Sequence, residues 1–281
     1  MTYSELMAAG VKLLSEAGFP EARTDARTLL FYVTGMDFMA LLRDGALQAE
    51  KEQEERFFAC LSERMKHVPV QYITGEQDFC GLRFFVQPGV LIPRPETELL
   101  AEVVFKESAG KRVLDMCTGS GCIAVTVAKL GTPVLVAASD YSEAALAVAR
   151  KNAELHNVPV TFFRGDLFEN VKGRYDLIVS NPPYIQSKVI EELMPEVRDF
   201  EPRMALDGAE DGLLFYRRIV RDAREFLNPG GRLLFEIGHD QGETVPEILF
   251  AEGYVSVEVK KDYAGLNRMV FAVWPGDNKE K

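Results

Sequence analysis

A polar and aromatic tetrapeptide follows a short apolar run at positions 176–180: Asn181, Pro182, Pro183 and Tyr184. The aliphatic and β-branched residues of the run predict a strand that is buried on both faces of a parallel sheet. The two prolines lack the backbone donors that a central strand needs, so the chain must leave the sheet after Asn181. We therefore expect an amide and an aromatic ring just past the carboxyl end of a core strand, where open α/β sheets bind ligands.

These residue types suit the alkylation of a planar NH2 group, whose nitrogen is a poor nucleophile because its lone pair is delocalised. If the side-chain oxygen of Asn181 and the carbonyl of Pro182 each accept one N–H, the nitrogen turns its π face toward an electrophile. The same acceptors stabilise the positive charge that develops on the nitrogen. Tyr184 can stack on the plane of the group. A plain strand terminator and turn uses the same residue types, so the surrounding sequence has to decide.

A glycine-containing loop lies further upstream, after the strand expected at positions 112–115. The strand ends at Asp115, a helix begins near Cys122, and the loop between them contains Cys117, Thr118, Gly119, Ser120 and Gly121. Its two glycines allow the backbone to approach a ligand closely at a helix N-terminus. The loop is therefore a candidate binding element.

Two further strand ends complete an adenosine-shaped site. The strand expected at 133–139 ends at Asp140, whose carboxylate can accept hydrogen bonds from both hydroxyls of a ribose. The strand expected at 160–164 is followed by Asp166 and Leu167. This aspartate can accept a hydrogen bond from the amino group of an adenine, and the leucine can cover the face of the ring.

The glycine loop by itself leaves two enzyme classes open. Gly119, Gly121 and Ala124, with Asp140 downstream, also satisfy the dinucleotide fingerprint of nicotinamide-dependent oxidoreductases. A methyltransferase uses the same loop for the methionine part of S-adenosylmethionine, and an acidic residue such as Asp115 then helps to hold the loop. The tetrapeptide after the fourth strand favours methyl transfer, because hydride transfer has no use for it.

Composition and charge restrict the partners. The 281 residues carry a net charge of −11, with a pI near 5.0, which disfavours an extended phosphate-binding surface, so we expect no direct contact with nucleic acid. The apolar runs are too short to span a bilayer, and the N-terminus has no basic leader, so neither a membrane anchor nor a signal peptide is expected. The four cysteines form no C-x-x-C pair and the three histidines are scattered. We therefore expect no metal and a reduced, cytoplasmic protein.

The hydrophobic pattern divides the chain into three parts. Positions 1–67 predict an N-terminal domain of helices only, suited to docking a substrate protein. Positions 68–92 carry prolines, glycines and alternating apolar residues, which indicate a β-hairpin linker. Positions 93–281 predict a doubly wound α/β domain. Its last two strands, at 254–260 and 267–274, resemble the antiparallel end of a methyltransferase sheet, so we expect a mostly parallel, seven-stranded, Rossmann-like sheet.

Over nearly its full length the sequence resembles the release factor glutamine methyltransferase family (PrmC/HemK) of class I SAM-dependent methyltransferases. The matching segments are 69–75, 81–86, 91–98, 115–121, 181–185, 201–206, 211–213, and 236–238 with Gln241. The tetrapeptide is shared with DNA adenine methyltransferases and other exocyclic-amine methyltransferases. The segment at 92–98, together with the helical N-terminal region, is much more specific to the family.

The resemblance implies methyl transfer from S-adenosylmethionine to the side-chain amide nitrogen of the glutamine in the Gly-Gly-Gln motif of peptide chain release factors, which leaves S-adenosylhomocysteine. Family roles fall on 118–121, Asp140, Asp166 and Leu167 for the cofactor, and on 181–184 for the glutamine. The loop's first glycine is replaced by Cys117, so we expect a negative φ there, the region that accepts a side chain comfortably. We expect a monomer.

Alternatives remain at this point. A nucleic-acid adenine N6-methyltransferase is favoured by the tetrapeptide but disfavoured by the net charge and by the lack of a basic, aromatic-rich recognition segment. A non-catalytic adaptor would not need the tetrapeptide beside an adenosine site. The irregular segment 201–212 is either a lid or an ordinary surface loop, and Arg94 faces either the site or solvent. Glu236, at the end of a core strand, could brace the site from behind.

Overall fold

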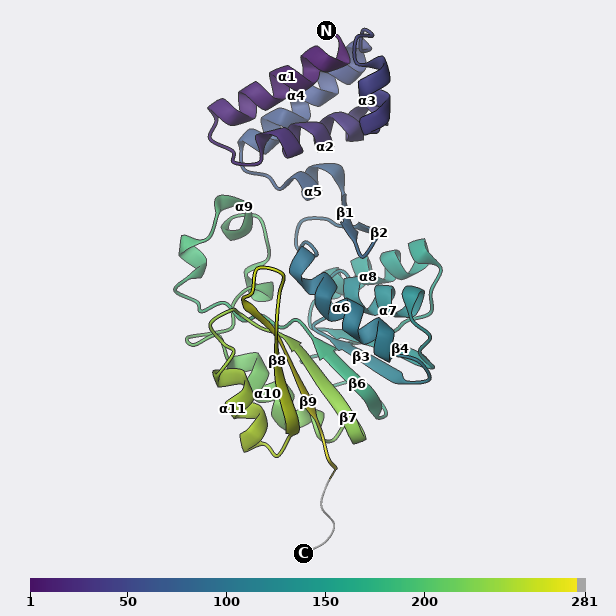
Figure 1. The fold of residues 1–281 in the computed structure, drawn as a ribbon, viewed down its shortest axis with the longest axis vertical. Coiled ribbons are helices and arrows are strands. Elements are labelled where there is room, and N and C mark those ends of the chain that lie inside the picture. The colour runs from purple at the N-terminus through teal and green to yellow at the C-terminus, as the bar shows by residue number, and fades with distance from the viewer. Residues whose placement is uncertain (277–281) are drawn as a thin grey trace, which may run out of the picture. The chain divides into compact units, whose positions relative to one another are not determined.

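The computed structural model describes residues 1–276, and within this range the chain divides into two units (Figure 1). Met1–Glu76 and Pro195–Phe200 make up the first, which we call the helical unit. Gln77–Met194 and the described residues from Glu201 onward make up the second, which we call the sheet unit. Positions 195–200 therefore belong to the helical unit, although their neighbours in sequence on both sides belong to the sheet unit.

Helices form nearly all of the helical unit: α1 (Tyr3–Glu16), α2 (Ala22–Thr34), α3 (Phe38–Asp44), α4 (Lys51–Met65), α5 (Val70–Thr74) and α9 (Pro195–Arg198). The first helix begins at a capping box, in which the side chains of Thr2 and Glu5 each accept a hydrogen bond from the other's backbone N–H. Leu6, Leu29 and Phe57 belong to the shared core of α1, α2 and α4. The helices predicted in this part of the sequence are therefore present.

The segment between the predicted domains differs from the expectation. Pro69 precedes a single helical turn, α5, which ends at Gly75 with a φ of 77°. The hairpin follows, with strands β1 (Glu76–Phe79) and β2 (Leu82–Phe85). The predicted hairpin therefore covers only positions 76–85 of the segment, because proline and glycine delimit a helical turn before it.

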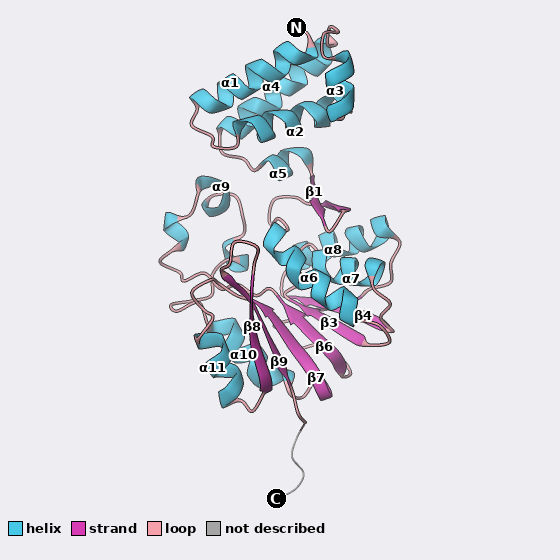
Figure 2. Ribbon diagram, in the orientation of Figure 1, coloured by secondary structure: helices cyan, strands magenta, loops and turns pink. Residues whose placement is uncertain are grey.

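The sheet unit is built on a sheet of seven strands within the described chain, in the order β5-β4-β3-β6-β7-β9-β8 (Figure 2). These are β3 (Arg112–Met116), β4 (Leu135–Asp140), β5 (Thr161–Arg164), β6 (Tyr175–Ser180), β7 (Leu227–Glu236), β8 (Val255–Lys261) and β9 (Asn267–Val273). Neighbouring strands run parallel, except that β9 is antiparallel to both β7 and β8. The predicted fold class, a mostly parallel seven-stranded sheet, is confirmed.

Successive residues of the central strands face two different cores. Val113 and Leu177 pack in a core with α6 (Pro95–Glu107), α7 (Cys122–Leu130) and α8 (Glu143–His156), whereas Leu114 and Ile178 pack with α10 (Leu214–Ala223) and α11 (Thr244–Ala251). The two groups of helices lie on opposite faces of the sheet (Figure 2). Because side chains alternate across a strand, a strand that is apolar at every position needs a cover on both faces.

The registers of the central strands bring three loops to one edge of the sheet. Met116 lies opposite both Ser139 of β4 and Ser180 of β6. Since these strands are parallel, their next residues are level with one another: Cys117, Asp140 and Asn181. The glycine loop, the ribose candidate and the tetrapeptide therefore start side by side.

Candidate active site

A cavity of about 630 Å³ lies at this edge, and its lining comes entirely from the sheet unit. The lining includes several residues that the sequence analysis singled out: Cys117, Gly119, Asp140, Asp166, Leu167, Asn181 and Pro183. The remaining candidates are not part of the lining: Asp115, Thr118, Ser120, Gly121, Pro182 and Tyr184. The structure therefore gathers the predicted cofactor and amide-binding residues around one space, some in its wall and some beside it.

Buried Asp115 anchors the glycine loop from below. Its Oδ2 accepts hydrogen bonds from the hydroxyl of Thr118 (2.6 Å) and from the backbone N–H of Ala124 (3.1 Å). Burial raises the pKa of this carboxyl to about 7. Within residues 1–276 its Oδ1 has no hydrogen-bond partner, and the residue is fully buried and outside the cavity lining.

The loop is also held against α8. Gly121 has a φ of 80°, and an added Cβ would lie 2.9 Å from the Cβ of Ala149. Asn152 donates hydrogen bonds to the carbonyls of Ser120 (2.9 Å) and Phe85 (3.0 Å), and its Oδ1 accepts one from the N–H of Phe85. Sequence reasoning missed Asn152. The available signal was a polar residue on the apolar stripe of a predicted helix.

The backbone at Cys117 contradicts the expectation of a negative φ. Its φ is 60°, in the left-handed region that normally favours glycine. The chain must turn sharply out of β3 here, because the N–H of Thr118 bonds back to the carbonyl of Ser139 at 3.0 Å. A side chain in this conformation costs about 1–2 kcal/mol. Burial also raises the pKa of the Cys117 thiol well above its ordinary value, so the thiol stays protonated and unreactive.

Asp140, at the end of β4, holds two backbone segments. Its Oδ2 accepts a hydrogen bond from the N–H of Gly119 and its Oδ1 one from the N–H of Ser142, both at 2.8 Å. Burial raises the pKa of the carboxyl. Each oxygen of a carboxylate can accept a second bond, so Asp140 can order the glycine loop and still receive two hydroxyl groups from the cavity.

The third strand end closes the other side of the cavity. Asp166 forms an ion pair with Arg218 of α10 at 2.8 Å, and both residues line the cavity. Leu167 is buried, with a φ of 54°, and its carbonyl accepts a hydrogen bond from the hydroxyl of Ser139 at 3.0 Å. The sequence analysis missed Arg218, since nothing in its spacing distinguishes it from other arginines on an exposed helix face.

Asn181 is the first member of a buried hydrogen-bonded chain. Its Nδ2 donates to Oγ1 of Thr97 (3.1 Å), and this hydroxyl donates to Oε2 of Glu236 (2.6 Å). The hydroxyl of Tyr184 lies 3.4 Å from the other oxygen of Glu236. An amide that turns its NH2 toward Thr97 presents its carbonyl oxygen on the opposite side. Glu236 was expected to brace the site from behind, and it is connected to Asn181 through the hydroxyl of Thr97.

Glu236→Gln should reduce a pH-dependent loss of stability. Burial raises the pKa of this carboxyl from 4.5 to about 7, so the folded protein binds its proton more tightly than the unfolded chain does. The free energy of unfolding should therefore fall as the pH rises from about 4.5 to about 7, by on the order of 3 kcal/mol from this group. Urea unfolding at about pH 5 and about pH 8 measures the fall. An equal fall in the variant and the wild type would contradict the assignment.

A second buried side chain, that of Gln241, joins the tetrapeptide to the end of the segment 201–212. Gln241 donates hydrogen bonds to the carbonyls of Tyr184 (3.2 Å) and Gly212 (3.1 Å), and accepts one from the N–H of Gly238 (2.9 Å). The backbones meet closely, because a Cβ added to Gly212 would lie 2.4 Å from the carbonyl oxygen of Tyr184. Gln241 was noted in the sequence only as part of the family resemblance. Its joining role depends on contacts between distant segments.

Gly212→Ala should therefore destabilise the fold more than a positive φ alone explains. The matched control is Gly230→Ala: Gly230 has a φ of 79°, close to the 74° of Gly212, but no atom within 4 Å of an added Cβ. We expect Gly212→Ala to lower the free energy of unfolding by about 2 kcal/mol more than the control, because of the clash. Denaturant titration of both variants measures the difference. Equal losses would show that the contact with Tyr184 relaxes freely.

Positions 201–212 form part of the site rather than an ordinary surface loop. Pro202, Met204 and Ala205 line the cavity, and Asp207 pairs with Ile185 in a parallel bridge. The side chain of Glu201 is 1% exposed and forms an ion pair with Arg94. The guanidinium of Arg94 therefore points toward the candidate site, where it is bonded to the segment that lines the cavity.

Residues 1–276 contain no group of three or more His, Cys, Asp or Glu side chains placed to hold a metal ion. Over the same residues, no helix has the length and apolar character needed to cross a bilayer.

Family comparisons cover most of the chain. Residues 93–197 match the Methyltransferase small domain, and residues 5–75 match the PrmC N-terminal domain. The Release factor glutamine methyltransferase of Geobacter sulfurreducens is 44% identical over 259 residues, which cover 92% of this chain and 91% of that protein. The Release factor glutamine methyltransferase of Clostridium acetobutylicum is 39% identical over 284 residues, which cover 98% of this chain and 100% of that protein.

Solved structures agree on the fold. A methyltransferase from Pyrococcus furiosus superposes with a TM-score of 0.55 at 24% identity, covering 70% of this chain and 90% of that one. The 16S rRNA N2 G1207 methyltransferase of T. Thermophilus, solved with AdoMet and guanosine, has a TM-score of 0.50 at 19% identity, covering 70% of this chain and 49% of that one. At these identities the likeness concerns the architecture alone.

Proposed function

This chain belongs to the release factor glutamine methyltransferases, and we propose that it methylates the glutamine of the Gly-Gly-Gln motif in peptide chain release factors. The methyl group comes from S-adenosylmethionine and goes to the side-chain amide nitrogen (N5), leaving S-adenosylhomocysteine. The single observation that carries this proposal is the position of the Asn181 amide, level with Asp140 and the glycine loop at one cavity. Asn181 and the residues proposed to bind the adenosine thus line one cavity.

The residues around the cavity fit S-adenosylmethionine. We propose that Asp140 receives the ribose hydroxyls, Asp166 the adenine amino group and Leu167 the face of the adenine. The loop from Cys117 to Gly121, held by Asp115, would cradle the methionine part. Support comes from the free acceptor positions on Asp140 and from a cavity of about 630 Å³, which lies within the range of small-molecule sites.

The tetrapeptide would then position the acceptor. Oδ1 of Asn181 and the carbonyl of Pro182 each accept one N–H of the substrate amide, while Pro183 and Tyr184 shape the surrounding wall. S-adenosylmethionine supplies a methyl group that is already activated on a sulfonium sulfur. Holding reactants in line can contribute roughly 7–11 kcal/mol to lowering a barrier. The amide proton becomes acidic only after transfer, so these residues need to act as acceptors and no strong base is required.

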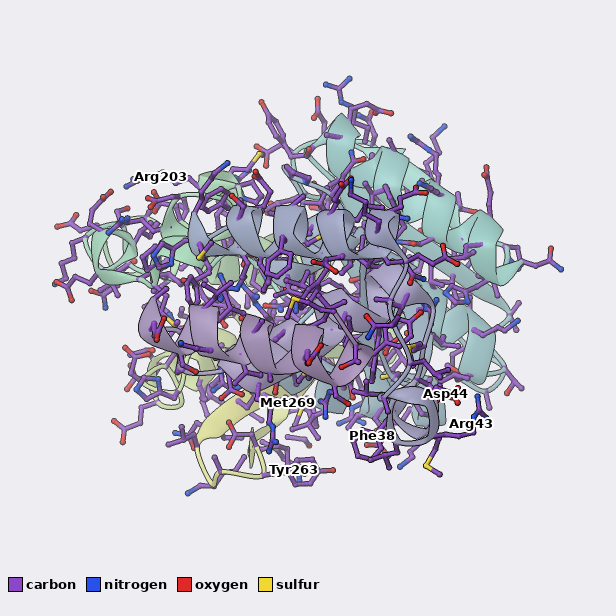
Figure 3. The ribbon with its side chains drawn as sticks, turned by 90° about the horizontal axis from the view of Figure 1, so that it is seen from above. Phe38, Arg43, Asp44, Arg203, Tyr263 and Met269 are labelled. Atoms are coloured by element: carbon purple, nitrogen blue, oxygen red, sulfur yellow. The ribbon has the colours of Figure 1, made fainter. Side chains whose placement is uncertain are left out.

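We further propose that the N-terminal helices, within positions 1–67, dock the release factor. Phe38, Met39 and Leu42 of α3 have exposed apolar side chains, and Figure 3 shows Phe38 on this helix together with the ion-paired Arg43 and Asp44. Exposed apolar side chains of this kind are typical of protein interaction sites. The net charge of −11 supports a protein rather than a nucleic acid as the partner. We propose a monomer that acts in the cytoplasm.

Incubation with labelled S-adenosylmethionine and a purified release factor tests the function, with mass spectrometry locating the modified atom. We expect one added methyl group on the glutamine of the Gly-Gly-Gln motif, and none on a release factor in which that glutamine is replaced by alanine. DNA with and without adenine is the parallel substrate. Methylation of adenine, with none of the release factor, would overturn the proposal in favour of an adenine methyltransferase.

A further inference from the structure

We propose that Thr97 and Glu236 are positioning residues for methyl transfer, which together orient the amide of Asn181 with its carbonyl oxygen toward the substrate. This inference rests on the proposed function, because the orientation matters only if Asn181 accepts a hydrogen bond from an NH2 group. Neither residue lines the cavity. Both act through Asn181 and do not touch the reacting atoms.

The three residues come from separate elements that meet behind the cavity. Thr97 lies in the first turn of α6, Glu236 is the last residue of β7, and Asn181 directly follows β6. Thr97 is 2% exposed and Glu236 is 1% exposed. Buried polar groups of this kind are stable only when they are hydrogen-bonded, and the hydrogen bonds of 3.1 Å (Asn181 to Thr97) and 2.6 Å (Thr97 to Glu236) satisfy that need. The chain is therefore continuous, and its Thr97 and Glu236 members are shielded from water.

The chemistry of the hydroxyl gives the chain a direction. A threonine has one hydrogen to donate, and an ionised carboxylate can only accept. With Glu236 ionised, the hydrogen of Thr97 must therefore point to Glu236, and the oxygen of Thr97 is left to accept from its other neighbour, Asn181. The NH2 of Asn181 then faces Thr97, and the carbonyl oxygen faces the cavity. A half-turn of this amide would present NH2 to the NH2 of the substrate, and no hydrogen bond could form.

Protonation of Glu236 reverses that direction. A neutral carboxyl can donate to Thr97, whose own hydrogen is then free to bond the carbonyl oxygen of Asn181. Burial sets the balance first, since it raises the pKa of Glu236 to about 7. The charged and titratable groups near the carboxylate come from several elements: Glu96 of α6, which opposes ionisation, Arg268 of β9, which favours it, Tyr184, and Tyr216 of α10, whose hydroxyl donates to the Glu236 carbonyl. Turnover should therefore depend on pH near neutrality.

Paired substitutions of Thr97 test the chain. Thr97→Val keeps the shape of the side chain but removes the hydroxyl. We expect kcat to fall roughly 10- to 100-fold, which is less than the roughly 10²- to 10³-fold fall expected when a whole preorganised polar group is removed. Thr97→Ser keeps the hydroxyl and should restore kcat to within about twofold of wild type. Calorimetry should show wild-type affinity for S-adenosylhomocysteine in both variants, because Thr97 does not line the cavity. Unchanged kcat in folded Thr97→Val would overturn the inference.

The pH profile provides a second readout that a merely structural role would not change. At saturating S-adenosylmethionine, wild-type kcat should fall below about pH 7, and the substrate glutamine does not itself titrate. Glu236→Gln should make this acid limb shallower, since the variant side chain carries no titrating proton, whereas Asp115, whose pKa is also raised to about 7, is the same in both proteins. An acid limb in Glu236→Gln that is as deep as in the wild type would overturn the inference. This readout does not depend on whether Thr97→Val folds. If the wild-type protein did not methylate a release factor at all, the proposed function itself would be refuted.

Discussion

Asn181→Ala should lower turnover on a release factor by roughly 10²- to 10³-fold, the loss that follows removal of one preorganised polar group in an active site. The alanine lacks the oxygen that faces the cavity, so the substrate amide loses one of its two acceptors and its alignment with the methyl donor. Affinity for S-adenosylhomocysteine should change little, because the groups proposed to bind the nucleoside belong to other strand ends. Single-turnover kinetics and calorimetry together measure this split.

The matched control is Asn228→Ala. Asn228 lies in β7 and donates a hydrogen bond to Asp176 at 2.7 Å, near the start of β6 and thus at the opposite edge of the sheet. The substitution removes a partly buried asparagine side chain that does not line the cavity. We expect turnover within about twofold of wild type, as for a substitution away from a site. Turnover near wild type in Asn181→Ala, with the control unaffected, would mean that Asn181 does not hold the substrate.

Asp140→Ala should show the opposite split, with cofactor affinity weakened first. The carboxylate is proposed to bind two ribose hydroxyls, and it also holds the N–H groups of Gly119 and Ser142. Hydrogen bonds to charged groups contribute about 1.5–3 kcal/mol each, so the loss of both ribose contacts should weaken S-adenosylhomocysteine binding by at least roughly 100-fold. Calorimetric titration measures the dissociation constant directly. At saturating S-adenosylmethionine, kcat should fall much less than the affinity does.

Asp222→Ala provides the control for this substitution. Asp222 is an acidic residue of α10 that pairs with its neighbour Arg221 on the surface at 2.7 Å, and it does not line the cavity. Exposed ion pairs of this kind contribute little, so the cofactor affinity should be unchanged. Wild-type affinity for S-adenosylhomocysteine in Asp140→Ala would mean that Asp140 does not bind the ribose.

Much of the fold could be predicted because its signals are local. The apolar run before Asn181 and the alternation of strands and helices after residue 111 predicted the sheet and its level strand ends. α10 was not anticipated, since its buried residues, such as Tyr216 and Ile219, are interleaved with arginines. The left-handed backbone at Cys117 also could not be predicted, because a tertiary hydrogen bond from Thr118 to Ser139 requires the turn.

The sequence by itself determined the class of fold, the strand ends that carry the adenosine candidates, and the tetrapeptide suited to a planar amide. Residue type and spacing are sufficient there, since periodicity and turn residues act over a few positions. The tertiary structure alone decided that Thr97 and Glu236 stand behind Asn181, and that Gln241 joins Tyr184 to Gly212. These contacts join residues far apart in the chain, and their geometry follows from how helices and strands pack, which no local pattern encodes.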